Sequence, residues 1–322
     1  MSRVLVTGGA GFIGLRLTQL LLDKGWQVRI LDIDTGVYIE VFTNPDILPG
    51  AEKVRGSILD ANAVAKAIEG CTHVVHCAAM VGVRRTETRR LECLNINIQG
   101  TVNILEACAK EQIERLVFIS SSELYGEPDR VPITEDAPRR GSSVYALTKM
   151  VGEEFVRAYH NRYKFSYGVA RLFNIYGEGQ VAEFVLPRFV KAVRENRPPT
   201  VYGTGQQERC FCHVADAVDG ILRILIYRDA PAEVFNIGND AESITMVELA
   251  ERVIATSSKT LKAQFVPMEE SDRRQGRDIQ RRVPSIEKAR RLLGYTPQVS
   301  LDEGIQRLLQ TETIVETYFE PL

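Results

Sequence analysis

The sequence predicts an α/β protein in which a doubly wound parallel sheet is followed by a smaller C-terminal α/β region. Three observations lead to this fold class. In the first half of the chain, short apolar runs rich in β-branched residues alternate with longer amphipathic stretches. The apolar runs are continuous, as in strands that helices cover on both faces. After Arg171, glycine and proline become frequent and the expected elements become shorter.

The expected elements follow this alternation along the chain. Strands are predicted where the apolar runs occur, at residues 3–6, 27–32, 53–55, 73–77, 116–120 and 166–171. Helices are predicted where apolar residues recur with helical spacing, at residues 14–24, 95–110 and 144–161. We expect a first domain at residues 1–172 and a second region at 173–322, with a return to the sheet near 207–238 that includes a strand at 234–237. The two regions are expected to share one cleft.

The composition excludes several classes of function. The 322 residues carry a formal net charge of -2, which provides no basic field for nucleic acid. No apolar stretch reaches the length of a membrane span, and the first strand begins without a signal peptide, so we expect a cytoplasmic protein. Cys210 and Cys212 alternate along a predicted strand without a second pair of ligands, so no metal site is expected. The pair Arg281-Arg282 is interpreted as solvated surface.

A glycine-rich turn directly follows the first strand. Gly8, Gly11 and Gly14 in the segment TGGAGFIG allow a tight turn, close approach of the backbone to a pyrophosphate, and close packing of helix on strand. The helix that starts there would direct its N–H groups at the phosphates. Asp32 ends the second strand, where a carboxylate can hold the ribose hydroxyls of NAD. Because no arginine follows it, the sequence favours NAD over NADP. The glycine-rich turn between strand and helix predicts that the sheet is of the Rossmann type.

Two further segments place reactive side chains near the carboxyl end of the sheet. Tyr145 and Lys149 open the helix predicted at residues 144–161 and share one of its faces, because residues four apart are neighbours on a helix. A nearby ammonium stabilises a phenolate by lowering the pKa of the tyrosine, which makes Tyr145 a candidate base for a substrate hydroxyl. A run of serines follows the fifth strand, where hydroxyl groups can relay a proton between a substrate and the tyrosine.

Together, the segments TGGAGFIG, SSSELYG and YALTK resemble the extended short-chain dehydrogenase/reductase family, and within it the NAD-dependent nucleotide-sugar epimerases and dehydratases. The resemblance covers nearly the whole chain and implies an enzyme. It aligns Ser121 with the catalytic serine or threonine of the family, beside Tyr145 and Lys149. It also implies a set of residues that bind NAD together with Tyr145 and Lys149: Gly8, Gly11, Phe12, Ile13, Asp32, Ile58, Ala78 and Ala79.

The second half of the chain carries segments that this family uses to bind its substrate. RLFNIYG contains Asn174, whose counterpart contacts the sugar nucleotide, and RCFCHVAD contains Arg209, whose counterpart binds a phosphate. Leu186 and Tyr202 occupy positions that usually wrap the nucleotide base, where an aromatic ring packs well. The resemblance therefore implies a nucleotide-sugar substrate.

The chain departs from the family pattern in two places. After the third strand it has Ser57 where the family commonly has an aspartate that faces adenine. Near the C-terminus the segment RPGD becomes QGRD, which displaces an arginine that binds phosphate. Arg274 or Arg277 is expected to take its place.

The first step in this family would be oxidation of the sugar at carbon 4 by NAD, after which three reactions are open. Reduction from the other face gives a 4-epimerase, loss of water gives a 4,6-dehydratase, and a sugar with a carboxylate at carbon 6 loses carbon dioxide. The pair Ser122-Glu123 resembles that of the decarboxylases and GDP-mannose 4,6-dehydratases, in which the glutamate can act as a base. The loop MVGVR, with Val83 and Arg84, resembles that of the 4-epimerases. We expect a 4-epimerase of a UDP-sugar or UDP-uronate, with the other two reactions as alternatives.

The sequence leaves two other classes of function as alternatives. A non-catalytic NAD-binding scaffold could use the same fold, but it would have no reason to keep serine, tyrosine and lysine together. A plain NAD-linked reductase would release its product. A homodimer is expected, because the helices at residues 97–110 and 144–161 resemble the pair that forms a four-helix interface in this family.

Overall fold

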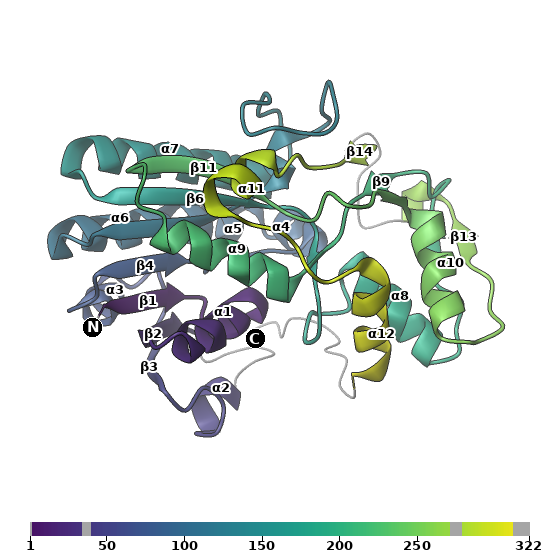
Figure 1. Ribbon diagram of the computed structural model, residues 1–322, viewed down its shortest axis with the longest axis horizontal. Helices are drawn as coiled ribbons and strands as arrows, with labels where there is room; N and C mark the ends of the chain where they lie inside the picture. Colours follow the sequence, from purple (N-terminus) through teal and green to yellow (C-terminus); the bar gives the residue numbers. More distant parts are fainter. Residues whose placement is uncertain (1, 34–39, 271–278, 312–322) are drawn as a thin grey trace.

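The computed structural model describes residues 2–33, 40–270 and 279–311. A seven-stranded parallel sheet lies between two layers of helices, and a smaller lobe stands beside it (Figure 1). Among the described residues, no helix combines the length and the hydrophobicity that crossing a bilayer requires. The predicted fold class is confirmed.

The central sheet has the strand order β11-β6-β5-β4-β1-β2-β3, and all neighbouring strands pair in parallel. Its strands are β1 (Arg3–Thr7), β2 (Gln27–Asp32), β3 (Ala51–Arg55), β4 (His73–His76), β5 (Arg115–Ser121), β6 (Ser166–Leu172) and β11 (Ala232–Ile237). Each predicted strand is present, with bounds that differ by at most two residues from those expected. The strand predicted at 234–237 is β11, which returns to the sheet beside β6.

Helices cover both faces of the sheet. On one face, α1 (Phe12–Asp23) packs against α9 (Val214–Ile226), and on the other α3 (Ala61–Ile68) and α7 (Val144–Tyr163) pack against α6 (Gly100–Glu111). Successive side chains of a strand therefore enter different cores. In β1, Val4 and Val6 belong to the core under α1 and α9, whereas Leu5 belongs to the opposite one. This double burial explains why the apolar runs in the sequence are continuous.

The helix predicted at residues 95–110 begins earlier and is interrupted. After α4 (Val83–Thr88), α5 (Arg90–Leu94) runs into a π-helical turn, η1 (Asn95–Gln99), which continues as α6. Asn97 in this turn binds both backbone groups of Met80, accepting from the N–H at 2.7 Å and donating to the carbonyl at 3.1 Å. The π turn thus holds the loop after β4. The extra residue in a π turn is not visible in an apolar pattern read with α-helical spacing.

The smaller lobe has its own core beneath helices from the second half of the chain. Its helices are α8 (Val185–Arg194), α10 (Met246–Thr256) and α12 (Leu301–Gln310). Short strands pair around them: β7 (Ile175–Tyr176) with β10 (Cys212–His213), β8 (Thr200–Tyr202) with β13 (Gln264–Val266), and β9 (Glu208–Arg209) with both β12 (Ile244–Thr245) and β14 (Arg281–Arg282). The remaining elements are α2 (Glu40–Thr43), η2 (Ser122–Tyr125), η3 (Met268–Glu270) and α11 (Glu287–Leu293).

One detail of this lobe differs from the sequence analysis. Cys210 and Cys212 do not share a strand, because Cys210 lies between β9 and β10 and Cys212 begins β10. All six cysteines have free thiols. The boundary at residue 172 between the two regions stays a prediction.

Candidate active site

A cavity of about 740 Å³ is lined by the carboxyl ends of the sheet strands and by the smaller lobe. Nearly all of the predicted site residues line it: Gly8, Gly11, Phe12, Ile13, Asp32, Ile58, Ala78, Ala79, Arg84, Ser121, Ser122, Glu123, Tyr145, Lys149, Asn174, Leu186, Tyr202 and Arg209. Val83 is the first residue of α4 and directly precedes Arg84 in the chain. Arg274 and Arg277 lie outside the described residues.

The loop between β1 and α1 depends on its glycines. Gly8 has φ of +68°, and a Cβ at this position would lie 2.7 Å from the backbone nitrogen of Ala78. A Cβ at Gly14 would lie 2.0 Å from the carbonyl oxygen of Gly8, so α1 could not approach the loop. The N-cap residue of α1 is Gly11, which offers no side chain to the first N–H groups of the helix. Because this end of the helix lines the cavity, it suits a pyrophosphate.

Asp32 lies at the end of β2 with its carboxylate held by the backbone. The Ala10 N–H donates to Oδ2 at 2.9 Å, and the Ile33 N–H donates to Oδ1 at 2.8 Å. Burial raises the pKa of Asp32 to about 6, because loss of hydration outweighs these two hydrogen bonds. The hydroxyls of a ribose would supply the further donors that this carboxylate needs. The glycine loop and Asp32 together therefore fit NAD.

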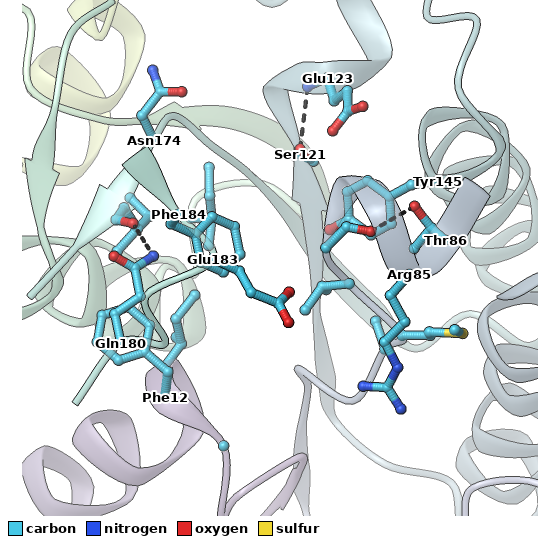
Figure 2. A pocket seen from close by; sticks show the side chains of 18 of the residues that line it. Phe12, Arg85, Thr86, Ser121, Glu123, Tyr145, Asn174, Gln180, Glu183 and Phe184 are labelled. Atoms are coloured by element: carbon cyan, nitrogen blue, oxygen red, sulfur yellow. Dashed lines mark hydrogen bonds between the residues drawn. The ribbon is translucent and has the colours of Figure 1, made fainter. Parts of the chain in front are cut away.

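Ser121 and Tyr145 come from adjacent elements on one side of the cavity (Figure 2). Ser121 ends β5, and its Oγ accepts from the Glu123 N–H at 3.2 Å, which starts the η2 turn. Tyr145 is the second residue of α7, a helix capped by the side chain of Ser143. The strand end and the helix start thus bring a hydroxyl and a phenol to the same wall.

Lys149 lies one helical turn after Tyr145 and is only 4 % exposed. Its Nζ donates to the Ile119 carbonyl at 2.8 Å and lies 5.6 Å from the centre of the Tyr145 ring. Burial lowers the pKa of Lys149 to about 8. An ammonium at this distance can stabilise a phenolate at Tyr145.

Glu123 also faces the cavity (Figure 2). Its Oε1 accepts a hydrogen bond from the Ser143 hydroxyl at 2.8 Å, so one carboxylate oxygen is engaged at the N-terminus of α7. Ser122 beside it is buried and brings no second acid.

A buried polar network fixes the elements behind these side chains. Glu153 of α7 accepts from the Ser120 hydroxyl at 2.7 Å and from two nitrogens of Arg171 at 2.9 and 2.7 Å. Arg171 also donates to the hydroxyl of Tyr125 at 2.8 Å. Bidentate ion pairs of this kind fix orientation as well as distance. The network therefore holds β5, β6 and α7 in one arrangement.

Two arginines from neighbouring strands face the cavity together. β9 and β14 pair in parallel, with Arg209 opposite Arg282, and both side chains are buried. Glu208 and Arg281 form an ion pair at 3.2 Å on exposed positions of the same strands. The interpretation of Arg281-Arg282 as solvated surface is therefore wrong for Arg282. A two-residue strand such as β14 is too short for a sequence pattern to reveal which of its side chains is buried. Together, the guanidinium groups of Arg209 and Arg282 fit a diphosphate.

Several other lining residues were missed by sequence reasoning. Gln180 and Glu183 come from the segment before α8, and Figure 2 shows them across the cavity from Tyr145. Arg188 and Gln207 line the part of the cavity that the smaller lobe contributes. No motif or periodicity marks these positions, because they lie in irregular segments or on the first turn of a helix.

Comparisons with known proteins agree with this geometry. The model of the NAD dependent epimerase/dehydratase family matches residues 4–238. The chain is 32% identical to a putative UDP-glucose 4-epimerase of Methanocaldococcus jannaschii, with 95% of this chain and 97% of the relative covered. It is 30% identical to the mouse dTDP-D-glucose 4,6-dehydratase, with 96% and 88% covered. It is 31% identical to a UDP-N-acetyl-alpha-D-glucosaminuronate decarboxylase of Bacillus cytotoxicus, with 96% and 97% covered.

Solved structures of similar proteins contain the expected cofactor. The UDP-glucose 4-epimerase of Thermus thermophilus in complex with NAD has a TM-score of 0.84 at 29% identity, with 95% of this chain and 97% of that chain covered. The UDP-glucuronic acid 4-epimerase of Bacillus cereus in complex with UDP-glucuronic acid and NAD has a TM-score of 0.86 at 29% identity, with 95% and 98% covered.

Proposed function

The chain belongs to the NAD dependent epimerase/dehydratase family, and we propose that it is a nucleotide-sugar 4-epimerase acting on a UDP-sugar or UDP-uronate. Its relatives are NAD-dependent enzymes of nucleotide sugars, and this chain is an enzyme of that kind. The finer assignment to 4-epimerisation is the proposal.

The side chains that line the cavity can carry both halves of such a reaction. When bound, NAD would take a hydride from carbon 4 of the sugar and return it. Tyr145 would accept the proton of the 4-hydroxyl, with Ser121 as the hydrogen-bonding relay between them. Lys149 would stabilise the phenolate, and Asp32 with the glycine loop would hold the cofactor. Arg209 and Arg282 would bind the diphosphate, which leaves the sugar free to turn between the two steps.

The state of Glu123 supports epimerisation over elimination. A 4,6-dehydratase needs a base that removes the proton of carbon 5 before water is lost. The carboxylate of Glu123 accepts a hydrogen bond from Ser143, and the neighbouring Ser122 is not an acid. This hydrogen bond ties Glu123 to the N-cap residue of α7, a structural contact that accounts for the side chain without a catalytic role.

The second candidate is a 4,6-dehydratase or a UDP-glucuronate decarboxylase in which Glu123 is the base. Its support is that Glu123 faces the same cavity as Tyr145 and that relatives of both kinds align over nearly the whole chain.

One experiment separates these candidates. Purified enzyme would be incubated with UDP-, dTDP-, GDP- and CDP-sugars, including UDP-glucuronate, and the products identified by NMR. We expect inversion at carbon 4, with Glu123→Gln reducing turnover by less than about tenfold, since the side chain would have no part in proton transfer. A 6-deoxy-4-keto sugar or a pentose as product, or loss of about 100-fold or more in Glu123→Gln, would support the second candidate instead.

We also propose that the enzyme is a homodimer. Leu91 on α5 is 83% exposed, and Leu147 and Val151 on α7 are 44% and 37% exposed. α5 and α7 pack against each other, so these apolar side chains belong to neighbouring helices. A second copy of the chain that covers them would remove this apolar surface from water.

A further inference from the structure

Where the smaller lobe lines the cavity, it contributes a set of apolar side chains, and this part of the lining is called the apolar end. Tyr202, Val201 and Phe211 line it together with Met246 and Met268. Aromatic and thioether side chains form favourable contacts with the faces of aromatic rings. The paired arginines of β9 and β14 stand in the same lobe and offer the separate, charged position that a diphosphate needs. If the proposed function holds, the nucleobase of the substrate lies at the apolar end.

Arg188 brings a hydrogen-bond donor to this end. It lies on the first turn of α8, and the centre of its guanidinium is 5.1 Å from the centre of the Tyr202 ring. Its Nε is buried and has no hydrogen-bond partner among the described residues. A buried donor without an acceptor is costly, and the cost is larger for a charged group. A ligand that supplies an acceptor would remove this cost.

Gln207 brings an unpaired acceptor to the same cavity. The residue is 6% exposed, and its Oε1 has no partner within the described part of the chain. It follows Tyr202 after the turn that contains Gly203 and Gly205, both with positive φ. The Gly205 carbonyl accepts from the Val247 N–H at 3.1 Å, which fixes the end of this turn.

We propose that Arg188 and Gln207 are the specificity residues that read the nucleobase of the substrate. Arg188 would donate to a ring carbonyl oxygen while its guanidinium stacks on Tyr202, and Gln207 would accept from the adjacent ring N–H. This edge occurs in uracil, thymine and guanine. Cytosine and adenine carry an amino group in place of that carbonyl and an unprotonated nitrogen in place of that N–H, so the Arg188 contact would fail and Gln207 would have to turn its amide to donate. The inference rests on the proposed function, because it takes the substrate to be a nucleotide sugar.

The test uses nucleotide binding and needs no turnover. The affinities of the purified enzyme for UDP, dTDP, GDP, CDP, ADP and inorganic pyrophosphate would be measured by calorimetry. The same set would be measured for Arg188→Met, Arg188→Lys and Gln207→Met. Lys191→Met is the matched control, because Lys191 is a cation on α8 that does not line the cavity. Cofactor content and thermal unfolding would be recorded for each variant.

We expect the wild-type enzyme to prefer one of UDP, dTDP or GDP over CDP and ADP. The affinities for UDP, dTDP and GDP identify which of the three bases it takes. Loss of a hydrogen bond to a charged group lowers affinity by roughly 10- to 100-fold, so Arg188→Met should lower the affinity for the preferred nucleotide by about this factor. In Arg188→Met, the ratio of the affinities for the preferred nucleotide and for CDP should approach one, while the affinity for pyrophosphate stays unchanged. The control variant Lys191→Met should bind every ligand as the wild type does. In turnover, KM should rise and kcat should change little.

Three results would overturn the inference. The first is an unchanged preference over CDP in both Arg188→Met and Arg188→Lys, and the second is a loss of pyrophosphate affinity in these variants as large as the loss of nucleotide affinity. The third is a wild-type preference for CDP or ADP. A structural role alone would change thermal unfolding without changing the ratio between nucleotides. Wild-type enzyme that shows the expected preference but converts its nucleotide sugar by a reaction other than 4-epimerisation would contradict the proposed function and leave this inference standing.

Discussion

Asp32 is expected both to select NAD as the cofactor and to make the affinity for NAD depend on pH. Its carboxylate already accepts two backbone N–H groups, yet burial still raises its pKa to about 6. An ionised carboxylate can accept from both hydroxyls of a ribose, whereas a protonated one has lost part of this capacity. We therefore expect NAD binding to be coupled to the proton on Asp32 near pH 6.

The affinity for NAD should consequently depend on pH. Because NAD favours the ionised form, its affinity should be constant above about pH 6 and fall as the pH is lowered through that value, by up to about tenfold per unit for one coupled proton. Fluorescence titration with NADH between pH 5 and 8 measures this. The Asp32→Asn variant should bind NADH more weakly than the wild type, and its affinity should not change with pH over this range. A flat profile in the wild type, or the same slope in Asp32→Asn, would be inconsistent with the coupling.

The residues that sequence reasoning found and those it missed differ in one physical respect. Gly8 acts within the turn between β1 and α1, and Tyr145 and Lys149 act within one helix, α7, so the spacing that matters is encoded locally in each case. Arg282 and Arg188 acquire their positions from tertiary packing, the former through pairing of β14 with β9 and the latter through contact of α8 with Tyr202. No local pattern in the sequence specifies such contacts.

At the scale of elements, long regular segments were predicted well and local irregularities were not. α7 was expected at residues 144–161 and is present as Val144–Tyr163, because apolar residues recur with helical spacing along this segment. The π turn before α6 was missed, although its Asn97 holds the loop at Met80 that lines the cavity. Irregular backbone at functional positions is expected to escape rules derived from regular elements.

The exposed apolar positions on α5 and α7 lead to a prediction at this scale. Introducing charge into the proposed interface with Leu147→Glu and Val151→Glu should shift the protein from dimer to monomer, since a buried unpaired carboxylate opposes association. Light scattering coupled to size exclusion measures the mass. Ile226→Glu is the control, because Ile226 is an exposed apolar residue at the end of α9 and its substitution should leave the dimer intact. A monomeric wild type would refute the interface.

At the scale of the whole molecule, the reaction cavity exists because two lobes meet at the carboxyl ends of the sheet strands. The sheet contributes the glycine loop, Asp32 and the Ser121–Tyr145–Lys149 set, and the smaller lobe contributes Arg209 and the residues around Tyr202. Figure 1 shows α8, α10 and α12 standing beside the sheet rather than on either of its helical layers. The cleft shared by the two regions was expected from sequence, while the set of residues on its substrate side was only partly foreseen.

The central claim is that the enzyme removes the hydrogen from carbon 4 of the sugar and returns it to the same carbon with inverted configuration. The most direct measurement is turnover of a UDP-sugar that carries deuterium at carbon 4, with the position of the label read by NMR and mass spectrometry. The account predicts an inverted product that retains deuterium at carbon 4, and at least about a 100-fold loss of this turnover in Tyr145→Phe with NAD still bound. Deuterium found at carbon 6, or released to water, would contradict it.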